Sequence, residues 1–176
     1  MSYFIIIIDD GEYRKKCGGR RRYYVYKYVL IFWRIDMAIK IIGTGSYLPE
    51  NVADNHFLST IVDTNDEWIS QRTGIKERRL SSGSKEGTTY MATQAAKNAM
   101  EDAGVTAEEI DLIIVATASA DTYVPNTSCQ VQGEIGAIRA TCFDLNAACS
   151  GFLFALNTAD AYLETGMAKT VLVIVA

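Results

Sequence analysis

The residues of this chain whose type and position are best suited to chemistry are Ala148-Cys149-Ser150. The apolar and β-branched residues of 139–146 predict a short buried strand before them. From Gly151 the apolar residues recur at helical spacing until Gly166, a stop signal. A cysteine in the first turn of a helix lies at the positive end of the macrodipole, which favours the nucleophilic thiolate. The pattern therefore indicates either a nucleophile or a small buried residue, the commoner role of free cysteines.

The elements that must position Cys149 alternate between strands and helices. Residues 38–42 predict a first strand, after which Gly43 and Gly45 are expected to form a tight turn. Other strands are predicted over 112–117 and 170–176, both with continuous apolar runs. Helices are predicted from an N-cap at Thr64 to Arg72, from Met91 to a stop at Gly104, and over 128–135. A second capping box, Thr106–Glu109, predicts a short turn before the strand at 112–117. This alternation predicts an α/β fold with a largely parallel sheet and helices on both faces.

Three motifs occur in order after Met37: Ile41–Pro49 (IIGTGSYLP), Asn65–Ile75 (NDEWISQRTGI) and Asn146–Phe152 (NAACSGF). Together they resemble the amino-terminal half of β-ketoacyl-acyl carrier protein synthase III, a condensing enzyme that starts fatty acid synthesis. The resemblance covers residues 37–176. It implies a thiolase-like fold, of which this chain carries the first of two pseudo-symmetric layered α/β/α halves.

The resemblance also implies roles for particular residues. Cys149 would take an acyl group from acyl-CoA, which is a substrate, so no cofactor is expected. Trp68 and Arg72, at i and i+4 on one helix face, would line the coenzyme A entrance; without the resemblance, a tryptophan anchoring its helix to the core is the alternative. Val124 would shape the primer pocket in a loop that reaches across a homodimer, and its small size favours a longer or branched primer.

The family's second substrate is malonyl-acyl carrier protein, which is condensed with loss of CO2. The histidine and asparagine that handle it belong to the family's second half. His56, the only histidine here, matches neither, so this chain alone is not expected to condense anything. Because the chain stops within a predicted buried strand, we expect a fragment or a truncated record. The alternatives are another thiolase-fold acyl-CoA condensing enzyme and a non-catalytic fragment that binds acyl groups or carrier protein.

Residues 1–36 form a leader outside the resemblance. They carry 8 Lys and Arg against 4 Asp and Glu, whereas residues 37–176 carry 9 against 17. One interpretation is upstream sequence translated from a misplaced start, disordered in the protein, with Met37 as the true start. The other is an arm that binds anionic membrane surfaces. The most apolar stretch of this leader, 29–33, has five residues, far below the roughly 20 residues of a membrane span.

Composition excludes several other classes of protein. The formal net charge of −4 gives no reason to expect nucleic-acid binding. The four cysteines (17, 129, 142 and 149) have no metal-ligand spacing, which predicts free thiols, no metal and a cytoplasmic location. The basic pair Arg78-Arg79 is compatible both with phosphate or carrier-protein attraction and with a solvated surface.

Overall fold

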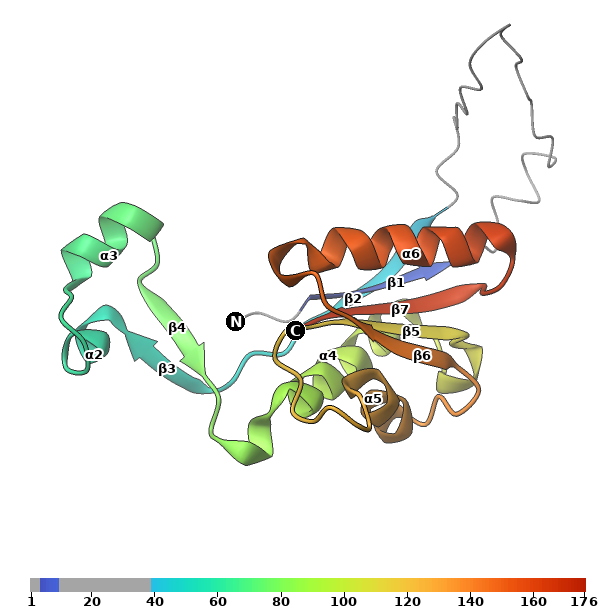
Figure 1. Ribbon diagram of the computed structural model, residues 1–176, viewed down its shortest axis with the longest axis horizontal. Helices are drawn as coiled ribbons and strands as arrows, with labels where there is room; N and C mark the ends of the chain where they lie inside the picture. The colour runs from blue at the N-terminus through green and yellow to red at the C-terminus, as the bar shows by residue number, and fades with distance from the viewer. Residues whose placement is uncertain (1–3, 10–38) are drawn as a thin grey trace, which may run out of the picture.

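A computed structural model of the chain describes residues 4–9 and 39–176. Figure 1 shows a layered α/β body from which a smaller lobe projects to one side. The body contains a five-stranded sheet covered by helices on both faces, and the lobe contains a two-stranded sheet with two short helices. The predicted α/β class is confirmed.

The sheet of the body has the strand order β2-β1-β7-β5-β6. Its strands are β1 (Phe4–Asp9), β2 (Lys40–Gly45), β5 (Leu112–Ala116), β6 (Thr141–Leu145) and β7 (Thr170–Val175). Strand β5 pairs in parallel with both β6 and β7, as the apolar runs predict. Strand β1 is antiparallel to both of its neighbours, β2 and β7. The sheet is therefore mixed, with β1 as its antiparallel member.

Strand β1 comes from the leader. We expected disorder throughout residues 1–36, but Phe4–Asp9 pairs along its whole length with β7. The physical reason lies in the backbone, because β2 and β7 present unpaired N–H and C=O groups to the gap between them and an extended segment satisfies both edges. The remainder of the leader, 1–3 and 10–36, lies outside the described residues, so the start at Met37 stays a prediction.

Helices cover the two faces of the sheet, α4 (Thr88–Ala103) and α5 (Thr127–Ile135) on one face and α6 (Gly151–Thr165) on the other. Strand β5 is fully buried and serves both layers because successive side chains alternate in direction. Ile113 and Val115 join the core under α4 and α5. Leu112 and Ile114 join the core under α6.

Gly43 and Gly45 do not form the tight turn we expected. They lie inside β2, directly beneath α4, where a Cβ on Gly43 would fall 2.6 Å from the Ala103 Cβ. A Cβ on Gly45 would meet the backbone of Ala95 and Ala99. The glycines and the alanine face of α4 thus allow helix and strand backbones to approach closely.

The lobe is built from β3 (Asn51–Asp54), α2 (Asn55–Ser59), α3 (Asp66–Thr73) and β4 (Glu77–Leu80). Strands β3 and β4 pair antiparallel, from Asn51 opposite Leu80 to Asp54 opposite Glu77. The N-cap of α3 is Asn65, whose side chain accepts a hydrogen bond from the Trp68 N–H, and not Thr64 as predicted. The second capping box is confirmed: Thr106 N–H donates to Glu109 Oε2 over 2.8 Å, ahead of the 3-10 turn Ala107–Glu109.

Candidate functional site: an exposed cysteine at the start of α6

Cys149 lies in a 3-10 turn, Ala148–Ser150, which runs directly into α6. Its side chain is exposed, so it is not the small buried residue that was the alternative interpretation. The backbone of Ala148 has a φ of 45°, the only positive φ outside glycine among the described residues. Such a conformation costs an L-residue on the order of 1 kcal/mol. Nothing in the sequence signals this bend, which turns the chain sharply between β6 and α6.

The turn is held by short-range polar contacts and by the core beneath it. Ser150 N–H donates to Ala147 O over 3.0 Å, and Ala148 N–H points to Asn146 Oδ1 at 3.4 Å. At the first residue of α6, a Cβ on Gly151 would lie 3.1 Å from the Ala116 Cβ. The start of the helix therefore rests closely on the end of β5, which fixes the position of the cysteine.

The start of α6 offers backbone donors next to the thiol. The first N–H groups of a helix have no partner within the helix and carry its positive partial charge. No backbone bond that the described residues make outside their helices and strands uses the Cys149 N–H. An exposed sulfur beside such donors can attack a carbonyl carbon while an N–H group stabilises the oxyanion that forms.

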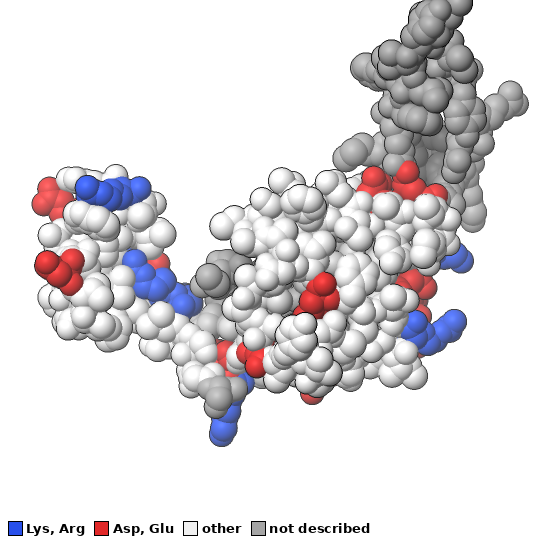
Figure 2. Space-filling view, viewed as in Figure 1, with Lys and Arg blue, Asp and Glu red and all other residues white. Residues whose placement is uncertain are grey.

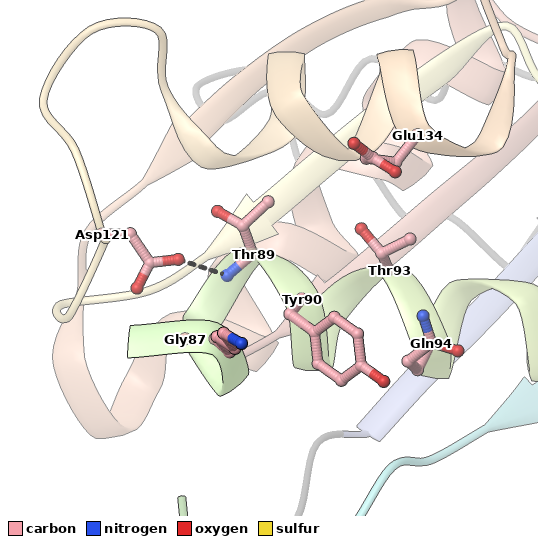
Figure 3. A pocket seen from close by; sticks show the side chains of 8 residues that line it. Gly87, Thr89, Tyr90, Thr93, Gln94, Asp121 and Glu134 are labelled. Carbon is pink, nitrogen blue, oxygen red and sulfur yellow. Dashed lines mark hydrogen bonds between the residues drawn. The ribbon is translucent and has the colours of Figure 1, made fainter. Parts of the chain in front are cut away.

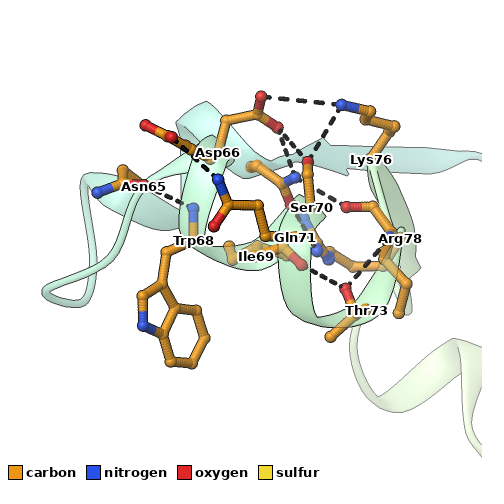
Figure 4. Close-up of polar contacts among 12 residues, drawn as sticks. Asn65, Asp66, Trp68, Ile69, Ser70, Gln71, Thr73, Lys76 and Arg78 are labelled. Atoms are coloured by element: carbon orange, nitrogen blue, oxygen red, sulfur yellow. Dashed lines mark hydrogen bonds and ion pairs between the residues drawn. The ribbon is translucent and has the colours of Figure 1, made fainter.

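Trp68 and Arg72 form a stacked pair on α3. The Arg72 Cζ lies 4.3 Å from the centroid of the Trp68 ring, within the range of a cation–π contact. Trp68 is 51% exposed. It does not anchor α3 to the core; the buried residue of this helix is Ile69. Figure 4 shows the indole directed away from the polar contacts on the other side of the helix.

Those polar contacts centre on Asn55, a residue that our sequence analysis did not single out. Asn55 is 1% exposed, and its Nδ2 donates to Asp66 Oδ1 over 2.7 Å and to Ile75 O over 2.8 Å. Its Oδ1 accepts from Arg78 Nη2 over 2.8 Å. The hydrogen bond from Asn55, and a second from Ser70, hold the pKa of Asp66 below its usual range. The buried Asn55 thus joins α2 to α3 through Asp66 and to β4 through Arg78.

The basic residues Arg78 and Arg79 make hydrogen bonds within the lobe and at its base. Arg78 Nη1 donates to Ala53 O over 3.2 Å in addition to its bond with Asn55. Arg79 Nη1 donates to Pro49 O over 3.0 Å. Both guanidinium groups therefore fix β4 against the neighbouring backbone, which neither of our interpretations of the pair anticipated. His56 is exposed on α2.

The candidate residues lie in different parts of the described structure. Cys149 is at the end of the body where β5, β6 and β7 finish, and in Figure 1 the lobe with Trp68 extends from this same side. Val124 is 79% exposed in the loop before α5. Figure 2 shows that the visible face of the body is largely uncharged, with basic side chains gathered on the lobe and at the far edge of the body.

A polar pocket of about 300 Å³ lies at the start of α4 and contains none of the predicted site residues. In Figure 3 Asp121 points at the first turn of that helix. Its carboxylate accepts from Thr88 N–H over 2.9 Å and from Thr89 N–H over 2.7 Å. Burial opposes ionisation of Asp121, but these N–H bonds outweigh it and lower the pKa. Asp121 therefore acts as a helix cap.

Among residues 4–9 and 39–176, no helix has the length and apolarity needed to cross a membrane.

Comparisons with known proteins agree with this geometry. The family described as 3-oxoacyl-[acyl-carrier-protein (ACP)] synthase III matches residues 143–176, which include Cys149. A relative from Clostridium acetobutylicum, named beta-ketoacyl-[acyl-carrier-protein] synthase III, is 58% identical over 137 residues, 78% of this chain and 42% of the relative. The chain thus spans about two-fifths of the length of the curated relatives it matches.

Two solved structures give the same result for the fold. The 3-oxoacyl-[acyl-carrier-protein] synthase III of Aquifex aeolicus aligns with a TM-score of 0.75 and 55% identity, over 78% of this chain and 44% of that one. The priming β-ketosynthase of the R1128 polyketide pathway aligns with a TM-score of 0.73 and 40% identity, over 76% and 40%. The fold is therefore that of the thiolase-like condensing enzymes. Within that class, the chain is similar over 78% of its own length to β-ketoacyl-[acyl-carrier-protein] synthase III proteins.

Proposed function

We propose that this chain accepts an acyl group from acyl-CoA on Cys149, as the acylation part of an initiating condensing enzyme of fatty acid synthesis. The observation that carries the proposal is the exposed Cys149 thiol in the turn that leads directly into α6. The family match over residues 143–176 supports it, because that match contains this turn.

The proposed reaction needs few groups. The Cys149 Sγ attacks the thioester carbonyl carbon, and the electron pair of the C=O bond moves to oxygen. Backbone N–H groups at the start of α6 stabilise that oxyanion. When the carbonyl re-forms, the C–S bond to coenzyme A breaks, the acyl group stays on Cys149, and the proton lost by the Cys149 thiol ends on the sulfur of coenzyme A.

Trp68 and Arg72 are proposed to bind the nucleotide of coenzyme A. An exposed indole can stack on adenine, and the guanidinium 4.3 Å from its centroid adds a positive charge for phosphate. Val124 is proposed to bound the acyl group, and its small side chain favours a longer or branched primer. Turnover of acetyl-CoA against isobutyryl-CoA by a complete enzyme tests the last point, and strict preference for acetyl-CoA would refute it.

The later steps are also part of the proposal. Condensation with malonyl-acyl carrier protein requires the histidine and asparagine that the family uses, and the one histidine here is exposed on α2. We propose that condensation depends on sequence beyond these 176 residues, in a homodimeric enzyme that works in the cytoplasm without a cofactor.

Incubation of the chain with acetyl-CoA, followed by intact-mass measurement, tests the acylation step. We expect a single acetyl group per chain and none on Cys149→Ser. Cys129→Ser is the matched control, since it removes another exposed thiol, and it should be acetylated at the rate of the unaltered chain. Equal labelling of Cys149→Ser would overturn the proposal.

A second comparison isolates the nucleotide contact. Trp68→Ala should slow acetylation by acetyl-CoA about fivefold, because a lost stacking contact is worth roughly 1 kcal/mol. Acetyl-N-acetylcysteamine has the same thioester without the nucleotide, so its rate should not change. An equal loss with both thioesters would show that Trp68 supports the fold and not the ligand.

A further inference from the structure

Two thiols outside the proposed acylation site lie in contact with each other. Cys129 is in the first turn of α5 and Cys142 is in β6, and their Sγ atoms are 3.3 Å apart. A disulfide has an S–S length of about 2.05 Å, so the two sulfurs need to move together by only about 1 Å. Side-chain rotation can supply such a movement without rearrangement of the backbone.

The backbones that carry the two thiols are held together on either side. The Asp144 carboxylate accepts from Thr127 N–H over 2.9 Å and from Ser128 N–H over 2.8 Å, which ties the start of α5 to β6. Further along the helix, Gln132 Nε2 donates to Ala140 O over 2.6 Å. The pair therefore sits between two fixed attachments, which keep its geometry ready for bond formation.

The two thiols differ in their surroundings. Cys129 is exposed, whereas Cys142 is partly buried. Burial, together with the hydrogen bond between Cys142 and Cys129, raises the pKa of the Cys142 thiol to about 11, so that sulfur stays protonated at neutral pH. A small oxidant from solution therefore meets Cys129 first, and Cys142 lies in contact behind it.

We propose that Cys129 and Cys142 are an oxidation site, which a small peroxide converts into an intrachain disulfide between α5 and β6. In the first step the Cys129 sulfur attacks hydrogen peroxide, an S–O bond forms as the O–O bond breaks, and water leaves. In the second step the Cys142 sulfur attacks the Cys129 sulfenic acid and loses its proton. The S–S bond forms, the S–O bond breaks, and a second water leaves. Peroxide is reduced and the two thiols are oxidised.

The bond would fasten α5 to the strand that leads to the Cys149 turn. It closes a loop between residues 13 positions apart, and such a crosslink stabilises the folded chain mainly by restricting the unfolded one. The oxidised chain should therefore unfold at a higher temperature than the reduced chain.

To test this proposal, the unaltered chain is treated with one equivalent of hydrogen peroxide and its remaining thiols are alkylated. The alkylated chain is then digested with trypsin and chymotrypsin. Cleavage after Arg139 and after Phe143 places Cys129, Cys142 and Cys149 in three different peptides. We expect a Cys129 peptide linked to the Cys142 peptide, lost on treatment with dithiothreitol, in a monomer that has lost two hydrogens.

Two variants serve as controls. Cys129→Ser should leave Cys142 fully alkylated and abolish the rise in unfolding temperature on peroxide treatment. Cys149→Ser should form the linked peptide as the unaltered chain does. The proposal is overturned if Cys129 is oxidised to sulfinic acid while Cys142 remains alkylated. It is also overturned if the Cys129 disulfide joins Cys149 or a second copy of the chain.

Discussion

Gly43 in β2 lies so close to α4 that an added Cβ would fall 2.6 Å from the Ala103 Cβ and 2.8 Å from the Ala99 carbonyl oxygen. Most of the atoms in the way are backbone atoms, which cannot rotate aside. The distance between helix and strand is therefore set by the absence of a side chain at Gly43 and at Gly45.

Gly43→Ala is expected to lower the free energy of unfolding by about 1–3 kcal/mol, the usual cost of overpacking. Gly133→Ala is the matched control, because Gly133 is inside α5 with open space around it. That substitution should stabilise the chain by about 0.5–1 kcal/mol. Urea unfolding of both variants checks the argument, and a destabilised Gly133→Ala would contradict it.

Asn55 should hold the lobe together. Asn55→Ala removes the acceptor of Arg78 and the donor to Asp66, and unpaired polar groups of this kind cost about 1–3 kcal/mol. We expect faster hydrogen exchange across Asp66–Thr73 and a rise in the pKa of Asp66 toward its ordinary value. The exposed Asn51 is the control, since Asn51→Ala should leave both unchanged. Unaltered exchange in Asn55→Ala would mean that the lobe is held by other contacts.

The Tyr47–Glu86 hydrogen bond makes stability depend on pH. Tyr47 Oη donates to Glu86 Oε1 over 2.7 Å, and this bond raises the pKa of Tyr47 to about 12 and lowers that of Glu86. As the pH rises, Tyr47 loses its proton in the unfolded chain before it does so in the folded chain. The stability that this hydrogen bond contributes is therefore complete below pH 10 and is lost as the pH rises toward 12. At acid pH the unfolded chain takes up the Glu86 proton first, so stability is lost as the pH falls below 4.5.

Tyr47→Phe is the measurement for this prediction. The variant should show a flatter dependence of unfolding temperature on pH at both extremes. The difference between the alkaline absorbance titrations of the two chains should show one phenol that ionises near pH 12. A Tyr47 that ionises with the exposed tyrosines would rule the hydrogen bond out.

Strand β1 should be needed for the sheet. Ile6 is opposite Thr44 on one side and Val173 on the other, and proline there removes a backbone donor between two paired strands. We expect Ile6→Pro to cost about 3 kcal/mol or more and to increase hydrogen exchange in both β2 and β7. Stability equal to that of the unaltered chain would show that β1 is dispensable.

Much of this fold could be predicted from residue patterns. The apolar run of 112–116 and the alanine face of α4 led directly to a buried parallel strand and its covering helix, because periodicity reports burial. Strand β1 could not be predicted in this way. An isoleucine run does not show which edges it pairs with, and the gap it fills is created by β2 and β7, which are far away in sequence.

The site could be predicted only in part. The position of Cys149 in the turn before a helix could be predicted from the strand and helix patterns on either side of it. The contact of Trp68 with Arg72 could be predicted from their i and i+4 spacing. The buried Asn55 and the contact between Cys129 and Cys142 depend on tertiary geometry, which no local pattern encodes. Even so, two cysteines on neighbouring predicted elements are a signal worth testing.

The most direct test of the central claim is to map, in one digest, where acetyl-CoA places its acetyl group among the four cysteines. We predict acetylation at Cys149, with Cys129 and Cys142 unmodified, although Cys129 is also exposed. An acetyl group spread over Cys149 and Cys129 alike, or absent from Cys149, would contradict the account.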